Sequence, residues 1–494
     1  MSGHVELQDH VVRTFAKSLT GGLLLPADDG YADARAVWNR MIDRRPALIA
    51  RCATVDDVVT AVRFAREHDL LISVKGGGHN VTGHAVCDGG LMIDLSLMKE
   101  ARVDPRERRA AVGPGATWKD VDSASQRHGL ATTGGIVSST GVAGLTVGGG
   151  HGWLMRKHGL ACDNLAAVEL VTADGAQLRA SPDENPELFW GLRGGGGNFG
   201  VVTSFEFHLH PLDIVLAGLL LHPLNRGREV LERYRDVTAT APDELVVGAL
   251  VTTWFDGTPV IAIALCYSGA VEVGERVVQP LRRLGRPLLD TVRPMPYAEL
   301  QTAFDATNPP SRWYYKTGYL DGAQFGGARF VEAFLDHCDF PSPSPLSRVY
   351  LEHLGGAMGR VAADQTAFVH RAAPFDLIVI AGGFRPEDAE KNVQWARRTS
   401  DAMQPFMSGG TYVNYLGADA SQDAVRSAYG SAYPRLVALK ERYDPHNVFR
   451  LNQNIRARNM GGPEMAQSEN MGGPDMAPQP PQRSERPGEP KTLL

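Results

Sequence analysis

The sequence predicts an α+β protein, whose first domain could by its pattern alone also be α/β, with two globular domains, a short C-terminal module and a terminal tail. A chain of 494 residues is too long for one ordinary hydrophobic core. Its glycine clusters lie within the first 200 residues, where short β-branched runs alternate with helical patterns. From about Leu212 the clusters thin out, and alternating strands and longer helices follow. This change indicates a first domain over 1–211 and a second over 212–409.

Apolar periodicity and turn residues define the elements of the first domain. We predict helices over 55–68 and 118–128 and strands over 71–74 and 110–112. Residues 164–172 and 176–180 flank Ala173-Asp174-Gly175, and this order of strand, turn and strand predicts a β-hairpin.

The remaining chain divides into the second domain, a short module and the tail. In the second domain we expect strands over 245–253, 260–267 and 377–384 and a helix over 389–403. The module over 410–455 combines the segment Tyr412-Val413-Asn414-Tyr415 with a helix from about Ser421 to Tyr443. The tail over 456–494 is rich in proline and holds too little apolar surface to offset ordering entropy, so we predict that it is disordered.

Charge and composition favour a small-molecule partner. A net charge of -6 provides no basic field for nucleic acid or anionic lipid. No stretch approaches the roughly 20 apolar residues of a membrane span, and the N-terminus lacks the apolar region of a secretory signal. The five cysteines are odd in number and widely spaced. We therefore expect a soluble, cytoplasmic protein whose cysteines are reduced.

Two apparent ligand motifs are set aside. Residues 195–200 satisfy G-x-G-x-x-G by letter, but a helical pattern precedes them and a strand-like run follows, the reverse of a dinucleotide-binding unit. His151 and His158 have no carboxylate at ligand spacing between them, and no zinc motif occurs. We expect no metal site.

The segment Lys75-Gly76-Gly77-Gly78-His79-Asn80 is the strongest candidate for a binding loop, because it directly follows an apolar strand. Three glycines permit positive φ and remove Cβ atoms, so that successive backbone N–H groups can turn toward one anion. From the residues alone, a pyrophosphate cradle and a simple glycine turn are equally good interpretations.

Further motifs decide between these interpretations. They occur in order along the chain: Lys75-Gly-Gly-Gly-His-Asn-Val-Thr-Gly83, Asp94-Leu-Ser96, Gly113-Pro-Gly-Ala-Thr-Trp118, Gly141-Val-Ala-Gly-Leu-Thr-Val-Gly-Gly-Gly150, Gly159-Leu-Ala-Cys-Asp-Asn164, Val171-Thr-Ala-Asp-Gly175, Phe189-Trp-Gly-Leu-Arg-Gly-Gly-Gly-Gly-Asn-Phe-Gly200, Tyr412-Val-Asn-Tyr415 and Tyr443-Asp-Pro-His-Asn-Val-Phe-Arg-Leu-Asn-Gln-Asn-Ile455. With them the chain resembles the FAD-linked oxidases of the vanillyl-alcohol oxidase or p-cresol methylhydroxylase fold, in the berberine-bridge-enzyme-like branch.

The resemblance implies a two-part FAD-binding domain, with its core over about 46–211 and completed by 410–455. It also implies a substrate domain in which helices back an antiparallel sheet. FAD would be held by a bond from His79 to the 8α carbon of the isoalloxazine. Many relatives add a cysteine tether, but that position falls at about Val137, and Cys162 lies too far along the chain. A single histidyl linkage is therefore expected.

The resemblance also implies the other contacts to FAD and the catalytic group. The expected contacts are Lys75, Gly76, Gly77, Gly78, Asn80, Ser138, Ser139, Thr140, Gly141, Gly144, Gly148, Val202, Asn414 and Asn452. Tyr415, with Tyr412 as the alternative, would accept the substrate proton, a role that requires a phenol pKa lowered from about 10. In a regular strand the two tyrosines would point to opposite faces.

The implied activity is oxidation of a C–H bond next to oxygen or nitrogen by hydride transfer to flavin N5, with dioxygen as the electron acceptor. A dehydrogenase of the same fold that uses another acceptor is the first alternative, because the position that gates oxygen in relatives falls near Thr140, neither the permissive valine nor the blocking leucine. A flavin-binding protein whose chemistry has lapsed is the second. Substrate identity and oligomeric state stay open.

Overall fold

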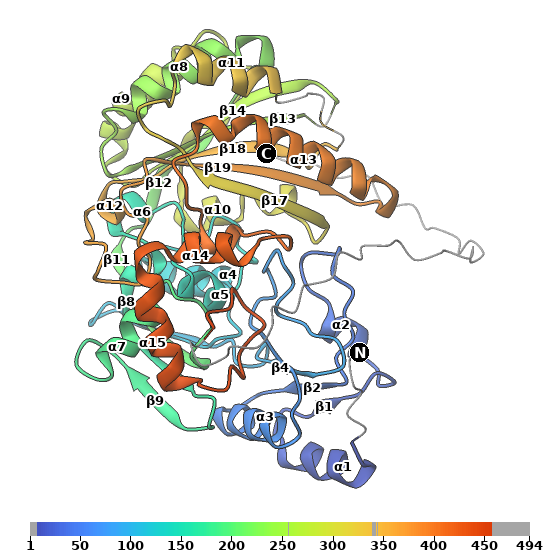
Figure 1. Ribbon diagram of the computed structural model, residues 1–494. Coiled ribbons are helices and arrows are strands. Elements are labelled where there is room, and N and C mark those ends of the chain that lie inside the picture. The colour runs from blue at the N-terminus through green and yellow to red at the C-terminus, as the bar shows by residue number, and fades with distance from the viewer. Residues whose placement is uncertain (1–6, 255, 338–341, 343, 457–494) are drawn as a thin grey trace. The chain divides into compact units, whose positions relative to one another are not determined.

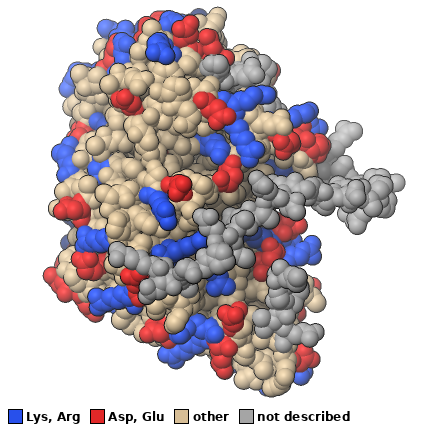
Figure 2. Space-filling model, in the orientation of Figure 1, with Lys and Arg blue, Asp and Glu red and all other residues tan. Residues whose placement is uncertain are grey.

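The computed structural model describes residues 7–254, 256–337, 342 and 344–456. The tail predicted to be disordered lies outside these residues, apart from Arg456. None of the described helices is long and apolar enough to cross a membrane. Figure 2 shows basic and acidic side chains interspersed over the face that it presents.

A four-stranded sheet near the N-terminus sets up the glycine loop. Its strands follow the order β1 (Leu23–Leu24), β2 (Leu48–Arg51), β4 (Leu91–Asp94) and β3 (Ile72–Lys75), with β2, β4 and β3 parallel. The connection from β2 to β3 is helix α3 (Val55–Glu67), which begins at Thr54 through a capping box with Asp57. Because β3 ends at Lys75, the glycines that follow it lie at the carboxyl edge of the parallel strands.

A five-stranded antiparallel sheet forms the second layer of this region. Its order is β5 (Ala101–Asp104), β6 (Arg109–Val112), β10 (Val201–His208), β8 (Leu165–Val171) and β9 (Gln177–Ala180). The predicted hairpin is confirmed as the pair of β8 and β9. Helix α7 (Pro186–Leu192) precedes the G-x-G-x-x-G letters and β10 follows them, which confirms the reversed order that set this motif aside.

An eight-stranded antiparallel sheet occupies the middle of the chain. Its order is β15 (Leu289–Asp290), β12 (Ile214–Pro223), β14 (Pro259–Tyr267), β13 (Leu245–Thr253), β18 (Arg348–His353), β19 (Phe375–Gly383) and β17 (Arg312–Tyr319), with β16 (Arg293–Pro296) also paired to β12. A two-stranded ribbon joins β7 (Leu130–Ala131) to β11 (His210–Pro211). The fold class is confirmed as α+β, whereas the proposed domain boundaries at 211/212 and 409/410 stay predictions.

The large sheet has one face covered by helices and one face turned toward the first region (Figure 1). The covering helices are α8 (Gly227–Thr238), α9 (Val271–Arg282), α11 (Ala328–His337) and α13 (Ala389–Met403). Side chains alternate along a strand, so Val349 and Leu351 of β18 pack into the core beneath the helices. Arg348, Tyr350 and Glu352 therefore point to the opposite face.

The C-terminal module differs from its prediction in its helix, and the segment before that helix is irregular. Val413–Tyr415 forms a 3₁₀ turn, not a strand, so strand alternation does not separate the two tyrosines. The single helix expected over 421–443 is two helices, α14 (Gln422–Tyr429) and α15 (Tyr433–Tyr443). Gly430 between them has a φ of 46°, a left-handed conformation that ends α14.

The remaining helices are short. They are α1 (Asp9–Ser18), α2 (Tyr31–Arg35), α4 (Trp118–Ser125), α5 (Val142–Val147), α6 (Met155–His158), α10 (Tyr297–Thr302) and α12 (Ala357–Arg360). Further 3₁₀ turns cover Gln126–His128, Ala161–Asn164, Leu224–Arg226, Asp305–Thr307, Pro386–Asp388, Gln404–Phe406 and Gly430–Ala432.

Candidate active site

A cavity of about 450 Å³ lies between the glycine segments and the helix-free face of the large sheet. One wall is formed by the backbone that follows β3, by the start of α5 and by Gly196, Gly197 and Gly200. The opposite wall is formed by apolar and aromatic side chains of the sheet, such as Leu250 and Tyr350. Its volume is typical of a pocket for a small molecule or cofactor.

Where the two glycine loops of the glycine wall lie closest to each other, there is no room for a side chain. A Cβ on Gly77 would lie 2.4 Å from Cα of Gly141, and a Cβ on Gly141 would lie 2.5 Å from N of Gly77. Gly78 has a φ of 68°, in the left-handed region. The two loops therefore meet backbone to backbone, which leaves their peptide groups free to approach a ligand.

His79 is fixed beside this wall. Its Nε2 atom lies 3.0 Å from Oγ of Ser139, and its ring stacks on Trp38 at a centroid distance of 4.9 Å. Trp38 in turn stacks on Trp313 of β17 at 5.0 Å. Burial lowers the pKa of His79 to about 4, so the imidazole is neutral at physiological pH and retains a nucleophilic nitrogen.

Most predicted FAD contacts line the cavity. Those that do are Gly76, Gly77, Gly78, His79, Asn80, Thr140, Gly141, Gly144, Val202, Asn414 and Asn452. The others stand behind the wall: Lys75 donates to the carbonyl of Ala34 at 2.5 Å, and Oγ of Ser138 donates to Asp305 at 2.6 Å.

Ser139 and Gly148 also act from behind the wall. Ser139 does not line the cavity, but its hydroxyl is hydrogen-bonded to His79, which does. Gly148 makes room for Asn414, because a Cβ on it would lie 2.1 Å from Oδ1 of that asparagine.

The cavity residues fit an FAD. Five of their buried polar atoms have no hydrogen-bond partner among the described residues: Nδ1 of His84, Nε2 of His151, Nε1 of Trp153, Oδ1 of Asn452 and Nε2 of Gln453. A buried polar atom without a partner is costly, so these atoms indicate a ligand with its own donors and acceptors. The side-chain-free glycine backbone suits a pyrophosphate, and the apolar walls suit flat rings.

Tyr412 does not line the cavity. Its hydroxyl accepts hydrogen bonds from the N–H of Gly150 and from Nδ2 of Asn414, both at 2.7 Å. Its ring stacks on His151 at 3.9 Å with an interplanar angle of 4°. These contacts make Tyr412 a support for His151 and Asn414.

Tyr415 does line the cavity, but its pKa moves in the direction opposite to the one expected. Burial raises the pKa of the Tyr415 phenol well above its usual value, and the nearby Glu352 raises it further. These surroundings therefore do not supply the lowered pKa that the role of a base requires. Its role as a base stays a prediction, which now depends on what the bound ligand adds.

Three buried residues lie beside Tyr415: His151, which was considered in the sequence only as a metal ligand, and Glu352 and Asp376, which were missed. Nδ1 of His151 lies 2.8 Å from Oε2 of Glu352, and Glu352 pairs with Asp376 across β18 and β19. Burial and the charge of Glu352 raise the pKa of Asp376 well above its usual range. The polar atoms of the three lie within 4.8 Å of one another, an arrangement that could also hold a metal ion.

A signal for these residues existed. Charged residues at 348 and 352 interrupt the otherwise apolar run Arg348-Val-Tyr-Leu-Glu-His353 on one face of a strand. A charge on a face that should be buried indicates a polar site. Only the pairing of the strands, however, shows that this face meets His151.

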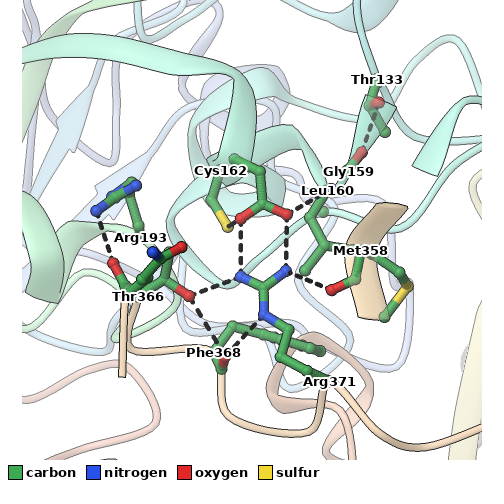
Figure 3. Close-up of polar contacts among 12 residues, drawn as sticks. Thr133, Gly159, Leu160, Cys162, Arg193, Met358, Thr366, Phe368 and Arg371 are labelled. Atoms are coloured by element: carbon green, nitrogen blue, oxygen red, sulfur yellow. Dashed lines mark hydrogen bonds and ion pairs between the residues drawn. The ribbon is translucent and has the colours of Figure 1, made fainter. Parts of the chain in front are cut away.

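A buried ion pair holds the loop behind His151. The guanidinium of Arg371 binds both carboxylate oxygens of Asp163 at 2.7 Å, and it also donates to Thr366 and to backbone carbonyls, as Figure 3 shows. The same loop presents Phe368 to His151 at a centroid distance of 5.9 Å. Cys162 lies beside this pair, is buried, and has a raised thiol pKa.

Two family models match the parts of the chain that carry the glycine loops and the C-terminal module. The family model described as FAD binding domain matches residues 46–181, and that described as berberine and berberine like matches residues 411–456. The chain is 32% identical over 450 residues to (R)-6-hydroxynicotine oxidase of Paenarthrobacter nicotinovorans, which covers 89% of this chain and 97% of that protein.

Two further comparisons agree. An FAD-linked oxidoreductase of Dictyostelium discoideum is 31% identical over 451 residues, covering 90% of this chain and 97% of that protein. The crystal structure of 6-hydroxy-D-nicotine oxidase from Arthrobacter nicotinovorans superimposes with a TM-score of 0.82 at 30% identity, covering 91% of this chain and 99% of that one.

Proposed function

Because the chain belongs to the FAD-linked oxidoreductases with a berberine-like C-terminal module, as its motifs predicted, we propose that it oxidises a small organic molecule with dioxygen as electron acceptor. The bond broken is a C–H next to oxygen or nitrogen. Bound FAD supplies the hydride acceptor at N5 and passes the electrons on. A neutral His79 on the wall of a cavity with a glycine backbone on one side is the observation that carries this proposal.

His79 is proposed to bond to the 8α carbon of the isoalloxazine. A neutral imidazole is the nucleophilic form, and burial keeps it neutral. Ser139 and Trp38 hold the ring in one orientation, which reduces the conformational freedom lost when a bond forms. We propose this as the single linkage, because Val137 lines the cavity where relatives place a cysteine.

The other predicted FAD contacts are assigned to different parts of the cofactor by their position in the cavity. We propose that Gly76 to Gly78, Asn80, Thr140, Gly141 and Gly144 contact the pyrophosphate and ribityl chain, Val202 the adenine, and Asn414 and Asn452 the flavin from the C-terminal module. The predicted division into domains over 1–211, 212–409 and 410–455 would then place the flavin site where all three meet, because each contributes to the cavity wall.

The substrate proton has two candidate acceptors. Tyr415 lines the cavity and would need the ligand to lower its pKa. His151 also lines it, and Glu352 fixes its tautomer by accepting from Nδ1, which leaves the lone pair on Nε2. That Nε2 atom has no partner among the described residues. We propose that Tyr415 contacts the substrate and that the pair of His151 and Glu352 is the alternative acceptor.

A panel of amines, alcohols and sugars tests the function under anaerobic conditions, with bleaching of the flavin absorption band as the readout. Bleaching followed by fast recovery in air is expected of an oxidase. Recovery that is slow in air but fast with an artificial acceptor would indicate the dehydrogenase alternative, and Thr140 would be the residue to vary. A flavin that no compound bleaches would point to lapsed chemistry.

A further inference from the structure

Arg348 is a buried cation that faces the cavity from the sheet. Its side chain lines the cavity, and its guanidinium lies 5.5 Å from the ring centroid of Trp313. It donates to the carbonyls of Leu346 and Thr307 and to Oδ1 of Asn308. These bonds are made by the two terminal nitrogens of the guanidinium.

The charge of Arg348 is not balanced by a carboxylate. No acidic group lies within ion-pair distance of its guanidinium in the described part of the chain, and none of the described cavity-lining residues is aspartate or glutamate. Glu352 shares its face of β18, but the Glu352 carboxylate is bonded to His151. A charge taken out of water is costly unless it is paired, so the cavity is suited to an anion that arrives with the ligand.

The surroundings of Arg348 are mixed, with apolar and aromatic side chains along most of the wall. In the sheet register, Arg348 lies opposite Ile380 on one side and Thr252 on the other, and Tyr350 lies opposite Ile378 and Leu250. The apolar side chains offer a surface for a flat, mostly apolar molecule, and Arg348 is the charged group on this wall.

We propose that the substrate is an apolar ring compound that carries an oxyanion, such as a carboxylate, phenolate or enolate, and that Arg348 binds this group. The proposal rests on the proposed function, since the same cavity holds both flavin and substrate. It adds the chemical class of the substrate and one specificity-determining residue. Arg348 stands on the substrate-facing sheet, across the cavity from the glycine wall, and so is placed for the substrate rather than for the pyrophosphate.

A pair of matched probes tests the charge requirement on the wild-type holoprotein. Titration calorimetry and perturbation of the flavin absorption spectrum are used to compare 2-naphthoate with 2-naphthamide, which have the same rings, and xylobiose serves as a carbohydrate. We expect 2-naphthoate to bind roughly 10- to 100-fold more tightly than the amide, the effect of one charge-assisted contact, and xylobiose not to bind. Equal affinities for the two naphthyl probes, or no binding of the carboxylate, would overturn the proposal.

Substitutions then assign the preference to Arg348. Arg348→Met is expected to bind the two probes equally, and Arg348→Lys to keep part of the preference. Arg385→Met removes an exposed arginine far from the cavity wall and is expected to keep all of it. Preference retained in a folded Arg348→Met protein, judged by circular dichroism, would remove this residue from the proposal. A protein purified without flavin would instead refute the proposed function, so the two failures are distinct.

Discussion

Oε2 of Glu352 lies 2.8 Å from Nδ1 of His151, although 201 residues separate the two in sequence. Both side chains are almost fully buried. The carboxylate holds the proton on Nδ1 and leaves Nε2 as the only nitrogen of the ring that can exchange a proton. The pair thereby joins the large sheet to the loop that follows α5, next to Tyr415.

The two candidate proton acceptors can be separated by rapid-reaction kinetics. Tyr415→Phe keeps the ring and removes the hydroxyl, so if Tyr415 is the base, anaerobic flavin reduction should slow by roughly 10²- to 10⁴-fold. Glu352→Gln should slow it by about tenfold or less in that case. A large effect of Glu352→Gln together with a wild-type rate for Tyr415→Phe would transfer the role to His151.

The proposed single linkage predicts that flavin attachment depends on His79 and on no cysteine. Acid-precipitated wild-type protein should keep its yellow colour, and His79→Ala should release all of it, because the linked nitrogen is gone. Cys162→Ala is the matched control and should stay yellow, since this thiol is buried beside Asp163 and has a raised pKa. Mass spectrometry of flavin peptides checks both, and a flavin found on Cys162 would contradict the single linkage.

The ion pair of Arg371 and Asp163 should contribute strongly to stability. Arg371→Met leaves a buried carboxylate without its partner, at a cost of about 3–5 kcal/mol in the free energy of unfolding measured with urea. Arg435 forms an equally well-aligned but more exposed pair with Glu187. Arg435→Met should cost at most about 1 kcal/mol, and similar losses in the two variants would argue against the role of burial.

Stability should fall as pH rises toward neutrality because of Asp122. Burial raises the pKa of this carboxyl from 3.8 to about 7, although Gln301 donates a hydrogen bond to it. Between those values the folded protein binds a proton that the unfolded chain has released, so stability decreases with rising pH across this window and levels off above it. The full effect amounts to about 4 kcal/mol.

Asp122→Asn removes this titration and can still accept from Gln301. It should be more stable than wild type at pH 8 and similar at pH 4, as measured by thermal unfolding. Asp183→Asn, on an exposed loop, should follow the wild-type curve. A wild-type pH profile retained in Asp122→Asn would show that other groups cause the decline.

The glycine wall was accessible to prediction because its information is local. A run such as Gly76 to Gly78 after an apolar strand limits backbone geometry by itself, and the hairpin at Ala173-Asp174-Gly175 follows from its turn residues. The break between α14 and α15 also had local signals. Gly430 is typical of a helix end, and Pro434 is typical of a helix start. The prediction of one helix over 421–443 gave more weight to the apolar pattern than to these two residues.

The sheet wall was not accessible in this way. The positions of Arg348 and Glu352 in the site follow from the strand register, which places them opposite Ile380 and Asp376. Register depends on tertiary packing, so the local sequence does not reveal these positions. Tyr412 likewise is turned from the cavity by bonds to Gly150 and Asn414, which no periodicity reports.

The cavity wall takes residues from nearly the whole length of the described chain, from Trp38 to Gln453. Asn198 ties this late segment down, donating to the carbonyl of Gln453 and accepting from the N–H of Ile455. During synthesis the pocket is therefore incomplete until these last residues have left the ribosome. A messenger cut short before this point would yield a chain with His79 in place but no finished pocket around it.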